Sequence, residues 1–381
     1  MSGEPNIIVV GASARAAAFS ALRAGMRPYA IDLFADSDLV DACPAVKVKR
    51  YPRDFEQALA AAPQAPWIYT GGLENHPDLI DRMAALRPLY GNGGDVLRKI
   101  RRPELLAACL AEADSDLAMP AICYSPPQPD SEFQWLQKPR RSSGGLGIRR
   151  VNSAAGEAQD ARHYYQQFIP GLSQSAVYAA HHGECELLGV TSQQSGVPEL
   201  PDEPFLYAGS ATTLRRLADE PLTELGRLLI RSFGLRGLFN VDYVDDGRRI
   251  WPLEVNPRYS ASVEVLECCL GQNFLARHVA EFNSSFQCTG DCSISHRPRH
   301  VAKRIVYATS ECVVTPGLNE LRKAWNQDAR RPYLADIPRP GDRIHRGQPV
   351  VTVIVDGTNE EAMHRLLEER VAAVYQTLSP V

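Results

Sequence analysis

Residues 239–264 read FNVDYVDDGRRIWPLEVNPRYSASVE, with two runs of β-forming residues on either side of Asp245-Asp246-Gly247, a turn signal. Side chains alternate between the two faces of a strand, so the pattern also predicts a register. A three-residue loop, in which Gly247 adopts a positive φ, places the apolar side chains of both runs on one face. That apolar face consists of Phe239, Val241, Tyr243, Trp251, Leu253 and Val255. The segment therefore predicts a hairpin with one apolar and one polar face.

The polar face of this hairpin carries the chemistry. The predicted register brings Asn240 and Asp242 beside Glu254 and Asn256. Two carboxylates and an amide are hard oxygen ligands that suit Mg²⁺, which proteins hold together with nucleotide phosphates. Arg258 is two residues beyond Asn256, so it lies on the same face if the extended run continues, and it could reach a phosphoryl group. The alternative is an ordinary amphipathic hairpin with a polar outer face.

Length and composition limit the protein class. A chain of 381 residues has room for two or three domains, and 44% hydrophobic with 23% charged residues is typical of a globular protein. The net charge of −4 argues against a nucleic-acid partner. No apolar run approaches membrane-spanning length, which argues against a membrane partner, and the start of the chain lacks a signal-peptide pattern. We therefore expect a cytoplasmic protein whose nine scattered cysteines are reduced thiols.

The first 92 residues predict a doubly wound βαβ domain. An apolar strand at residues 6–10 precedes an Ala-rich helix that Gly25 ends, and a second strand spans residues 27–32. An NAD(P)-dependent oxidoreductase would open in this way. However, the turn from Gly11 through Ser13 lacks the second and third glycines that let backbone approach a pyrophosphate. Gly11 and Ser13 remain candidates for binding an anionic substrate group at the helix N-terminus.

A second candidate substrate segment follows the strand at residues 67–70. There Gly71-Gly72 precede Glu74 and Asn75, just past the carboxyl end of a parallel strand, where sheets of this kind bind ligands. The alternative role for Glu74 and Asn75 is to cap the helix that begins at Pro77.

Residues 135–148 predict a phosphate-binding flap. A strand ends in Lys138-Pro139, and a Ser/Gly loop leads into a second strand. Backbone N–H groups of Ser143, Gly144, Gly145 and Gly147 could fold onto phosphates, with Lys138 as a point charge. No Gly-Lys-Ser/Thr opens a helix here, so this is not a Walker loop. Alone, the segment also fits a simple hairpin loop.

The remaining pattern predicts further elements and one weak metal motif. We expect helices at about 95–113, 221–233, 360–378 and up to about residue 283, and a hairpin tip at His181-His182-Gly183. Strands are expected near 119–122, 302–308 and 348–355. The spacing Cys288-x3-Cys292-x3-His296 does not match a zinc knuckle, so we assign it no metal.

The order of these motifs resembles the ATP-grasp superfamily of ligases over essentially the whole chain. The sequence shows Lys-Pro with a Gly-rich flap, then Gln-Gln-Phe-Ile-Pro-Gly, Asn-Val-Asp-Tyr and Glu-Val-Asn-Pro-Arg. The resemblance implies an α/β and α+β chain: a Rossmann-like domain at 1–92, an ATP-grasp domain at 93–290 and a small α+β module at 291–381. Within the ATP-grasp domain it implies a flap lobe at about 120–168 and a metal-hairpin lobe at about 170–285.

The resemblance also implies ATP with Mg²⁺ or Mn²⁺ as cofactors and assigns roles to residues. It implies that Lys138 contacts the nucleotide phosphates, and that Arg258 lies near an acyl phosphate. The flap would consist of Ser143, Gly144, Gly145 and Gly147. The segment that lines the adenine would be Gln166, Gln167, Phe168 and Ile169, and the metal ligands would be Asp242, Glu254 and Asn256. Two positions depart from the family pattern. Gln167 stands where the family usually has glutamate, and Lys99 is slightly early for the second phosphate lysine, with Arg102 nearby.

The activity implied is ADP-forming ligation of small-molecule substrates, in which a carboxylate becomes an acyl phosphate and is joined to an amine. The C-terminal module looks like that of predicted ATP-dependent carboligases, which suggests biosynthesis of a one-carbon cofactor of the tetrahydromethanopterin or methylofuran type. Alternatives are a carboxylase that forms carboxyphosphate from bicarbonate and a nucleotide-binding regulator without turnover. The resemblance also implies a homodimer.

Overall fold

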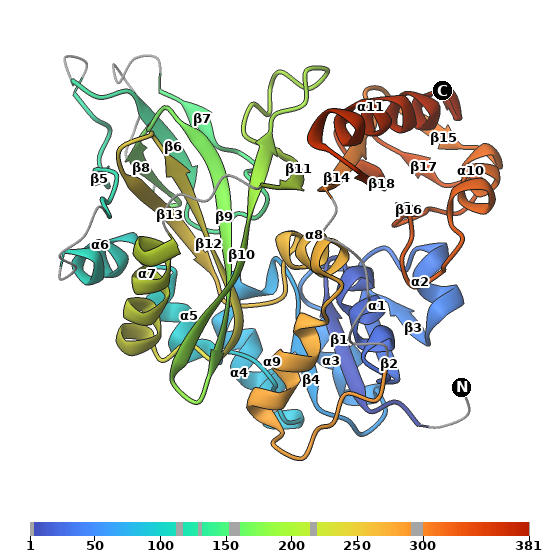
Figure 1. Ribbon diagram of the computed structural model, residues 1–381, viewed down its shortest axis with the longest axis horizontal. Helices are drawn as coiled ribbons and strands as arrows, with labels where there is room; N and C mark the ends of the chain where they lie inside the picture. The colour runs from blue at the N-terminus through green and yellow to red at the C-terminus, as the bar shows by residue number, and fades with distance from the viewer. Residues whose placement is uncertain are drawn as a thin grey trace.

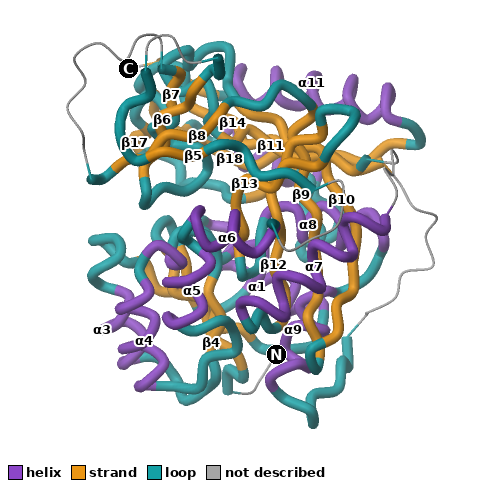
Figure 2. The backbone as a smooth tube through the Cα atoms, turned by 90° about the vertical axis from the view of Figure 1, so that its left-hand side faces the viewer, coloured by secondary structure: helices purple, strands orange, loops and turns teal. Residues whose placement is uncertain are grey.

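The computed structural model describes residues 4–111, 117–128, 132–151, 161–213, 219–290 and 300–380. Within these ranges the strands form four sheets (Figure 1). Figure 2, turned by 90°, shows the sheet of β5–β8 and the C-terminal strands on one side of the molecule, and the N-terminal helices α3–α5 on the other. No described helix is long and apolar enough to cross a membrane.

The N-terminal sheet is parallel and has the order β3-β2-β1-β4. Its strands are β1 (Ile7–Gly11), β2 (Pro28–Asp32), β3 (Ala45–Lys47) and β4 (Trp67–Tyr69). The connecting helices are α1 (Arg15–Arg23), α2 (Ser37–Ala42), α3 (Phe55–Ala61), the 3₁₀ turn η1 (Leu73–Asn75) and α4 (Pro77–Leu86). Every residue of β1 is buried, as expected for a parallel strand covered on both faces. The predicted βαβ opening is confirmed, and Gly25 follows the end of α1 with φ +81°.

The central sheet is antiparallel and has the order β13-β12-β9-β10-β11-β14-β18-β16. Its strands are β9 (Leu172–His181), β10 (Glu184–Ser195), β11 (Tyr207–Thr212), β12 (Gly237–Asp245), β13 (Ile250–Asn256), β14 (His300–Tyr307), β16 (Leu334–Ala335) and β18 (Pro349–Gly357). Through the pairing of β11 with β14, the C-terminal strands continue the sheet that holds the central hairpin. The domain bounds at residues 92 and 290 stay predictions.

Two smaller sheets complete the fold. One has the order β5-β8-β6-β7, with β5 (Ile122–Cys123), β6 (Trp135–Pro139), β7 (Arg149–Arg150) and β8 (His163–Gln167). The other consists of β17 (Arg343–Ile344), β15 (Cys312–Val314) and β19 (Leu378–Pro380). The remaining helices are α5 (Gly94–Ile100), α6 (Pro103–Leu110), α7 (Asp219–Phe233), α8 (Ala261–Leu270), α9 (Phe274–Phe282), α10 (Gly317–Trp325) and α11 (Glu360–Gln376).

Two long helices expected from the sequence are each divided. The helix expected at 95–113 is α5 and α6, because Pro103 cannot donate a backbone hydrogen bond and begins a new helix instead. The helix expected up to residue 283 is α8 and α9, because Gly271 adopts φ +64° and ends α8.

The β12–β13 hairpin confirms the predicted pairing of its polar residues but corrects its apolar face. Asp242 pairs with Glu254, and Asn240 with Asn256. The register then shifts by one residue at Leu253, so Tyr243 faces Pro252 and the loop has four residues, 246–249. As a result Ile250 and Pro252 are buried, whereas Trp251 and Leu253, which we had expected on the apolar face, are only partly buried.

The apolar face of this hairpin packs into a core beneath α7. The rings of Tyr178 and Phe239 stack with centroids 4.8 Å apart. Val241 and Tyr243 extend the same cluster, which includes Leu225 from α7. Burial of one face fixes the register, and so holds the polar residues of β12 on the opposite face.

A buried ion network joins the N-terminal domain to the central sheet. Arg15, which is 1% exposed, donates to Glu264 on α8 and, at 2.9 and 3.0 Å, to Asp336. Lys303 Nζ on β14 lies 2.5 Å from Glu264 Oε2. Burial alone would raise the pKa of Glu264, but Arg15 and Lys303 lower it to about 2. Three segments far apart in sequence therefore meet at one carboxylate.

The cysteines depart from the sequence expectation at one position. Seven described cysteines carry free thiols, but Cys288 is disulfide-bonded, so the expectation that all nine are reduced is wrong there. Cys292 and His296 lie outside the described residues.

We predict that Glu264→Gln destabilises the fold by about 3 kcal/mol at pH 7, because it removes the carboxylate that the buried Lys303 contacts and one of the two carboxylates that Arg15 contacts. The control is Glu224→Gln on α7, where a partly exposed carboxylate pairs with Arg231 at the surface. It should change stability by about 0.5 kcal/mol or less. Because the folded-state pKa of Glu264 is lowered from 4.5 to about 2, the difference between wild type and Glu264→Gln should narrow as pH falls through this range. Urea unfolding at several pH values measures this difference in stability. Equal stability of the wild type and Glu264→Gln at pH 7 would contradict a stabilising role of the buried ion network.

Candidate active site

A cavity of about 770 Å³ opens where the N-terminal domain, the β6–β8 sheet, the hairpin and the C-terminal strands meet. Most of the site residues expected from the sequence line it: Ser13, Glu74, Lys138, Ser143, Gly144, Gly145, Gln166, Gln167, Phe168, Ile169, Asp242, Glu254, Asn256 and Arg258. The polar face of the hairpin is therefore a wall of a cavity, and the alternative of a plain solvent-facing surface does not hold.

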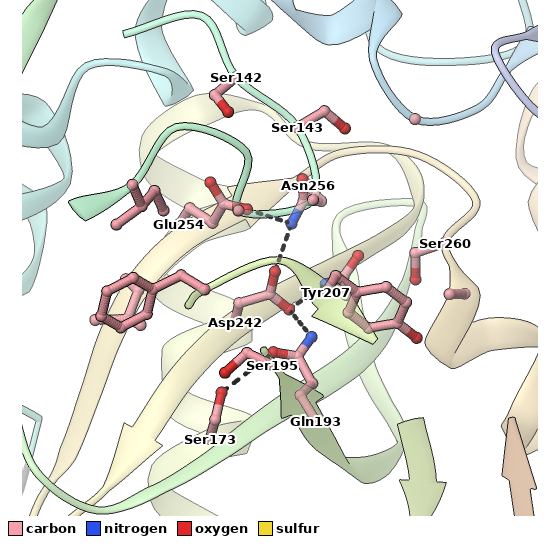
Figure 3. Close-up of a pocket in the computed structure, with 18 of the residues that line it drawn as sticks. Ser142, Ser143, Ser173, Gln193, Ser195, Tyr207, Asp242, Glu254, Asn256 and Ser260 are labelled. Atoms are coloured by element: carbon pink, nitrogen blue, oxygen red, sulfur yellow. Dashed lines mark hydrogen bonds between the residues drawn. The ribbon is translucent and has the colours of Figure 1, made fainter. Parts of the chain in front are cut away.

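Asp242 is at the centre of the polar face and accepts hydrogen bonds on both oxygens (Figure 3). Oδ1 accepts from Gln193 Nε2 at 2.8 Å and from Asn240 Nδ2 at 2.9 Å. Oδ2 accepts from Asn256 Nδ2 at 2.9 Å, and the same amide group lies 3.4 Å from Glu254 Oε1. Neutral amides thus orient both carboxylates without neutralising them.

The two carboxylates titrate differently. Burial, together with the neighbouring Glu254, raises the pKa of Asp242 to about 6. Burial would also raise the pKa of Glu254, but Arg101 and Lys138 lower it. The Glu254 side chain is 41% exposed because it faces the cavity, and its Oε2 lies 3.6 Å from Arg101 Nη1. Asp242, whose pKa is raised by burial and by a neighbouring carboxylate, is the kind of group that a bound cation would stabilise in its charged form.

Arg258 is held by the N-terminal domain. Its Nε and Nη2 donate to Glu74 Oε1 at 3.2 and 3.0 Å, and Nη2 also donates to Asn256 Oδ1 at 3.0 Å. The side chains of Glu74 and Arg258 are 2% and 12% exposed. Burial would lower the pKa of Arg258, but Glu74 raises it, so the guanidinium stays charged.

The alternative in which Glu74 and Asn75 cap the following helix is wrong. The residue that precedes α4 is His76, and no side chain caps that helix. Asn75 Nδ2 instead donates to the Ser142 carbonyl at 3.0 Å, and its Oδ1 accepts from Arg101 Nη2 at 2.7 Å. Asn75 therefore connects the flap to Arg101 without lining the cavity itself.

The Ser/Gly loop is a compact turn attached to the central sheet. Gly144, Gly145 and Gly147 all have positive φ, and a Cβ on Gly145 would lie 1.9 Å from the Phe205 carbonyl oxygen. The Tyr207 N–H donates to the Gly144 carbonyl at 2.8 Å. The chain path therefore requires glycine at Gly145, which a simple solvent-exposed hairpin loop would not.

Comparison with known proteins now identifies the central part of the chain. A family model described as the ATP-grasp domain matches residues 107–262. The chain contains an ATP-grasp domain. An uncharacterized protein of Methanocaldococcus jannaschii is 24% identical over 165 residues, which cover 43% of this chain. The matched segment covers only 37% of the length of that relative.

Solved structures extend the likeness to the whole chain. The ADP complex of N5-carboxyaminoimidazole ribonucleotide synthetase has a TM-score of 0.68 at 13% identity, covering 99% of this chain and 98% of that one. L-amino acid ligase from Bacillus licheniformis has a TM-score of 0.66 at 14% identity, with the same coverage. A putative ATP-grasp superfamily protein from Archaeoglobus fulgidus has a TM-score of 0.57 at 15% identity, covering 92% and 99%. At these identities the likeness shows the fold, which is the ATP-grasp fold expected from the motif order.

Four expected site residues do not line the cavity. Gly11 ends β1, and a Cβ there would lie 1.8 Å from Thr70 Oγ1, so it serves close packing. The Gly147 N–H donates to Glu203 Oε2 at 3.1 Å. Lys99 is exposed on α5. Asn75 contacts Arg101, which lines the cavity, but does not line the cavity itself.

Sequence reasoning left open which basic residue near 99–102 meets the phosphates, and it missed Gln193. Arg101 lies just past the end of α5 and lines the cavity, which Lys99 does not. Pro103 is the signal that could have identified Arg101, because proline predicts that the preceding helix ends near this residue. The side chain of a residue just past a helix end points in another direction than a side chain within the helix. Gln193 lies on β10 outside any motif, and only its pairing partners reveal its place beside Asp242.

Unpartnered polar atoms concentrate at this cavity. Five buried side-chain atoms in the described part of the chain have no hydrogen-bonding partner. Four of them belong to residues that line the cavity: Glu74 Oε2, Gln166 Nε2, Asn240 Oδ1 and Ser260 Oγ. Buried polar groups are rarely left unpaired, so this concentration fits a cavity built around a polar ligand.

A second group of metal-ligating side chains lies elsewhere. His181, His182 and Glu281 have ligand atoms within 4.8 Å of one another, at the predicted hairpin tip between β9 and β10. Arg236 Nε already donates to Glu281 Oε1 at 2.7 Å. The charge of Glu281 is thereby compensated, so this group is less suited to a cation than the Asp242–Glu254 pair.

We predict strong coupling between Glu74 and Arg258. Arg258→Met should destabilise the protein by about 3 kcal/mol, since it leaves the Glu74 carboxylate buried without a counter-charge. Glu74→Gln in the Arg258→Met background should restore part of this loss, giving a coupling energy of about 1–3 kcal/mol in a double-mutant cycle of urea unfolding. Additive effects of the two substitutions would mean that the ion pair does not hold Arg258.

Proposed function

We propose that this protein is an ATP-dependent, ADP-forming ligase that activates a carboxylate as an acyl phosphate and joins it to an amine. The observation that carries the proposal is the Asp242–Glu254 pair beside Arg258, facing a cavity inside an ATP-grasp fold. Within this proposal, the likeness of the C-terminal module to predicted carboligases points to a biosynthetic substrate of the one-carbon cofactor type, and a homodimer remains part of the expectation.

The residues fit Mg²⁺, or Mn²⁺, as the proposed cofactor. Asp242 and Glu254 would supply carboxylate oxygens, which are hard ligands suited to either ion. Asn256 would supply its amide oxygen only after its side chain turns, because in this structure its NH₂ group faces the two carboxylates and its Oδ1 accepts from Arg258. The bound ion would neutralise charge on the nucleotide phosphates. The orphaned Asn240 Oδ1 beside Asp242 supports a polar occupant at this wall.

ATP would lie between the flap and the hairpin in this proposal. Lys138, Arg101 and the flap N–H groups surround the position proposed for the phosphates. The segment from Gln166 to Ile169 would receive the base, with Leu136 and Ile148 as apolar walls. Apolar walls with a few polar groups are usual for such pockets.

Two transfers complete the proposed reaction. A carboxylate oxygen of the substrate attacks the γ-phosphorus, and the bond to ADP breaks. The amine nitrogen then attacks the acyl carbon, phosphate leaves with the bonding electrons, and the nitrogen gives up one proton. Arg258 stabilises charge on the transferred phosphoryl oxygens, and closure of the flap keeps water from the acyl phosphate. No protein nucleophile is needed.

A bicarbonate-dependent carboxylase is the second candidate. One similar structure, the biotin carboxylase domain of Hydrogenobacter thermophilus 2-oxoglutarate carboxylase, was crystallised with MgADP and bicarbonate, at a TM-score of 0.64 and 11% identity. Omission of bicarbonate separates the candidates. ADP release that continues with a carboxylate and an amine supports the amide ligase, whereas a strict bicarbonate requirement supports the carboxylase.

The proposal predicts metal-dependent ATP binding that requires Arg101. Mg-ATP at about one hundred times its dissociation constant should stabilise the wild type by roughly 2.7 kcal/mol, and EDTA should abolish most of the gain. Arg101→Ala should weaken Mg-ATP binding by at least about tenfold, from loss of a charged phosphate contact. The matched control Lys99→Ala, two residues away and exposed, should bind like wild type. Thermal unfolding titrations measure both.

Two outcomes would contradict this proposal. The first is stabilisation by NADPH without any shift from Mg-ATP, which would favour the oxidoreductase alternative at the N-terminal sheet. The second is ATP binding that is equally strong in EDTA, which would remove the metal role of the hairpin.

A further inference from the structure

The turn between β9 and β10 brings two histidines together. His182 and Gly183, which form this turn, have φ +50° and +83°, and positive φ at both positions is typical of a type I′ turn. Neighbouring side chains of an extended strand point to opposite faces, but the positive φ of His182 ends that alternation. As a result, the ring centroids of His181 and His182 lie only 4.1 Å apart. The turn therefore presents a pair of imidazole rings.

A buried carboxylate on α9, which lies beside this turn, faces the two histidines (Figure 1). The Glu281 side chain is 5% exposed, and its Oε2 lies 3.1 Å from His181 Nδ1. Ligand atoms of His181, His182 and Glu281 all lie within 4.8 Å of one another. Two ligands of a tetrahedral Zn²⁺, each about 2.0–2.1 Å from the ion, are separated by about 3.3 Å. The observed spacing is close to that value, so small side-chain rotations would bring the three ligand atoms onto one ion.

Arg236 fixes the carboxylate of Glu281. Its Nε donates to Oε1 at 2.7 Å, and its Nη2 donates to the main-chain carbonyl of Glu281 at 3.1 Å. The guanidinium also lies 4.6 Å from the ring centroid of Phe282. These contacts leave Oε2 on the side of the histidines, where it accepts from the His182 N–H at 2.9 Å. Carboxylates that ligate metals are usually hydrogen-bonded in this way by the residues around them.

The donor atoms of this group determine which kind of ion suits it. Arg236 compensates the charge of Glu281, which disfavours Mg²⁺, an ion that takes oxygen ligands and usually binds carboxylates. Imidazole nitrogen is a preferred ligand of Zn²⁺, Ni²⁺ and Cu²⁺. Two histidines with one glutamate are a ligand set that zinc proteins use, with the fourth position open to water.

We propose that His181, His182 and Glu281 form a second metal site, which binds Zn²⁺ or a related transition-metal ion. The three side chains supply three ligands and water the fourth, so the ion joins the β9–β10 turn to α9. The site uses none of the residues assigned to ATP or to substrate, and it therefore does not depend on the proposed function. The alternative is an ordinary ion pair between His181 and Glu281.

Isothermal titration of the metal-free protein with Zn²⁺ tests this proposal, with excess Mg²⁺ present to fill the hairpin site. His181→Ala removes one ligand, and His182→Asn removes another with a residue that tolerates positive φ. The matched control is His364→Ala on α11, where a similarly exposed histidine lies 3.8 Å from Glu360. That pair has no third ligating residue in the described part of the chain. Free thiols also bind Zn²⁺, so the measurement is the difference between these proteins and not the total uptake.

We expect the wild type and His364→Ala to bind one Zn²⁺ ion at least about tenfold more tightly than either His181→Ala or His182→Asn, because loss of even an outer-shell partner costs about that much. Equal Zn²⁺ affinity in the wild type and both histidine variants would overturn the site and leave the ordinary ion pair. Absence of wild-type Zn²⁺ binding in excess Mg²⁺ would overturn it as well. Neither result requires nucleotide binding, so failure of the ligase proposal would leave this test unchanged.

Discussion

The pairing of Asp242 with Glu254 across β12 and β13 is the constraint on which the rest of the site depends. Like charges directly opposite in a sheet are destabilising, so the pairing needs support from elsewhere in the fold. The apolar reverse face supplies it, with Phe239 stacked on Tyr178 and covered by α7. The amides of Asn256 and Gln193 orient the acids without cancelling their charge. Stability gained on one face thereby maintains an acidic pair on the other, as functional sites often require.

The cavity is completed by contacts between parts of the chain that are distant in sequence. Glu74, from the turn η1 of the N-terminal domain, holds Arg258 of the hairpin segment, and Glu264 joins Arg15 of α1 to Lys303 of β14. In each case a buried carboxylate meets arginine or lysine, an arrangement that costs much free energy when one partner is missing. The N-terminal domain therefore acts as part of the site, although its own glycine turn contributes only Ser13 among the residues expected there.

The sequence was informative where local pattern determines structure. Alternation fixed the pairing of Asp242 with Glu254, and the order of motifs predicted the ATP-grasp fold. The bulge at Leu253 could not be predicted, because one extra residue in a strand leaves the local alternation plausible in either register. The sequence did not single out Arg101 among its basic neighbours, because the orientation of this side chain depends on where α5 ends. Gln193 was missed because its contact with Asp242 arises only from pairing across the sheet. The orientation of these side chains depends on packing between distant parts of the chain, which the local periodicity of one sequence does not show.

The most direct test of the central claim is the position of a bound metal. Crystals grown with Mn²⁺ and a non-hydrolysable ATP analogue should show an anomalous difference peak between the carboxylates of Asp242 and Glu254, with the nucleotide phosphates beside it. Mn²⁺ is suited to this measurement because it takes the same oxygen ligands as Mg²⁺. A peak at His181, His182 and Glu281 with none at the hairpin, or a nucleotide bound at the turn after β1, would contradict the proposal that the hairpin is the catalytic centre.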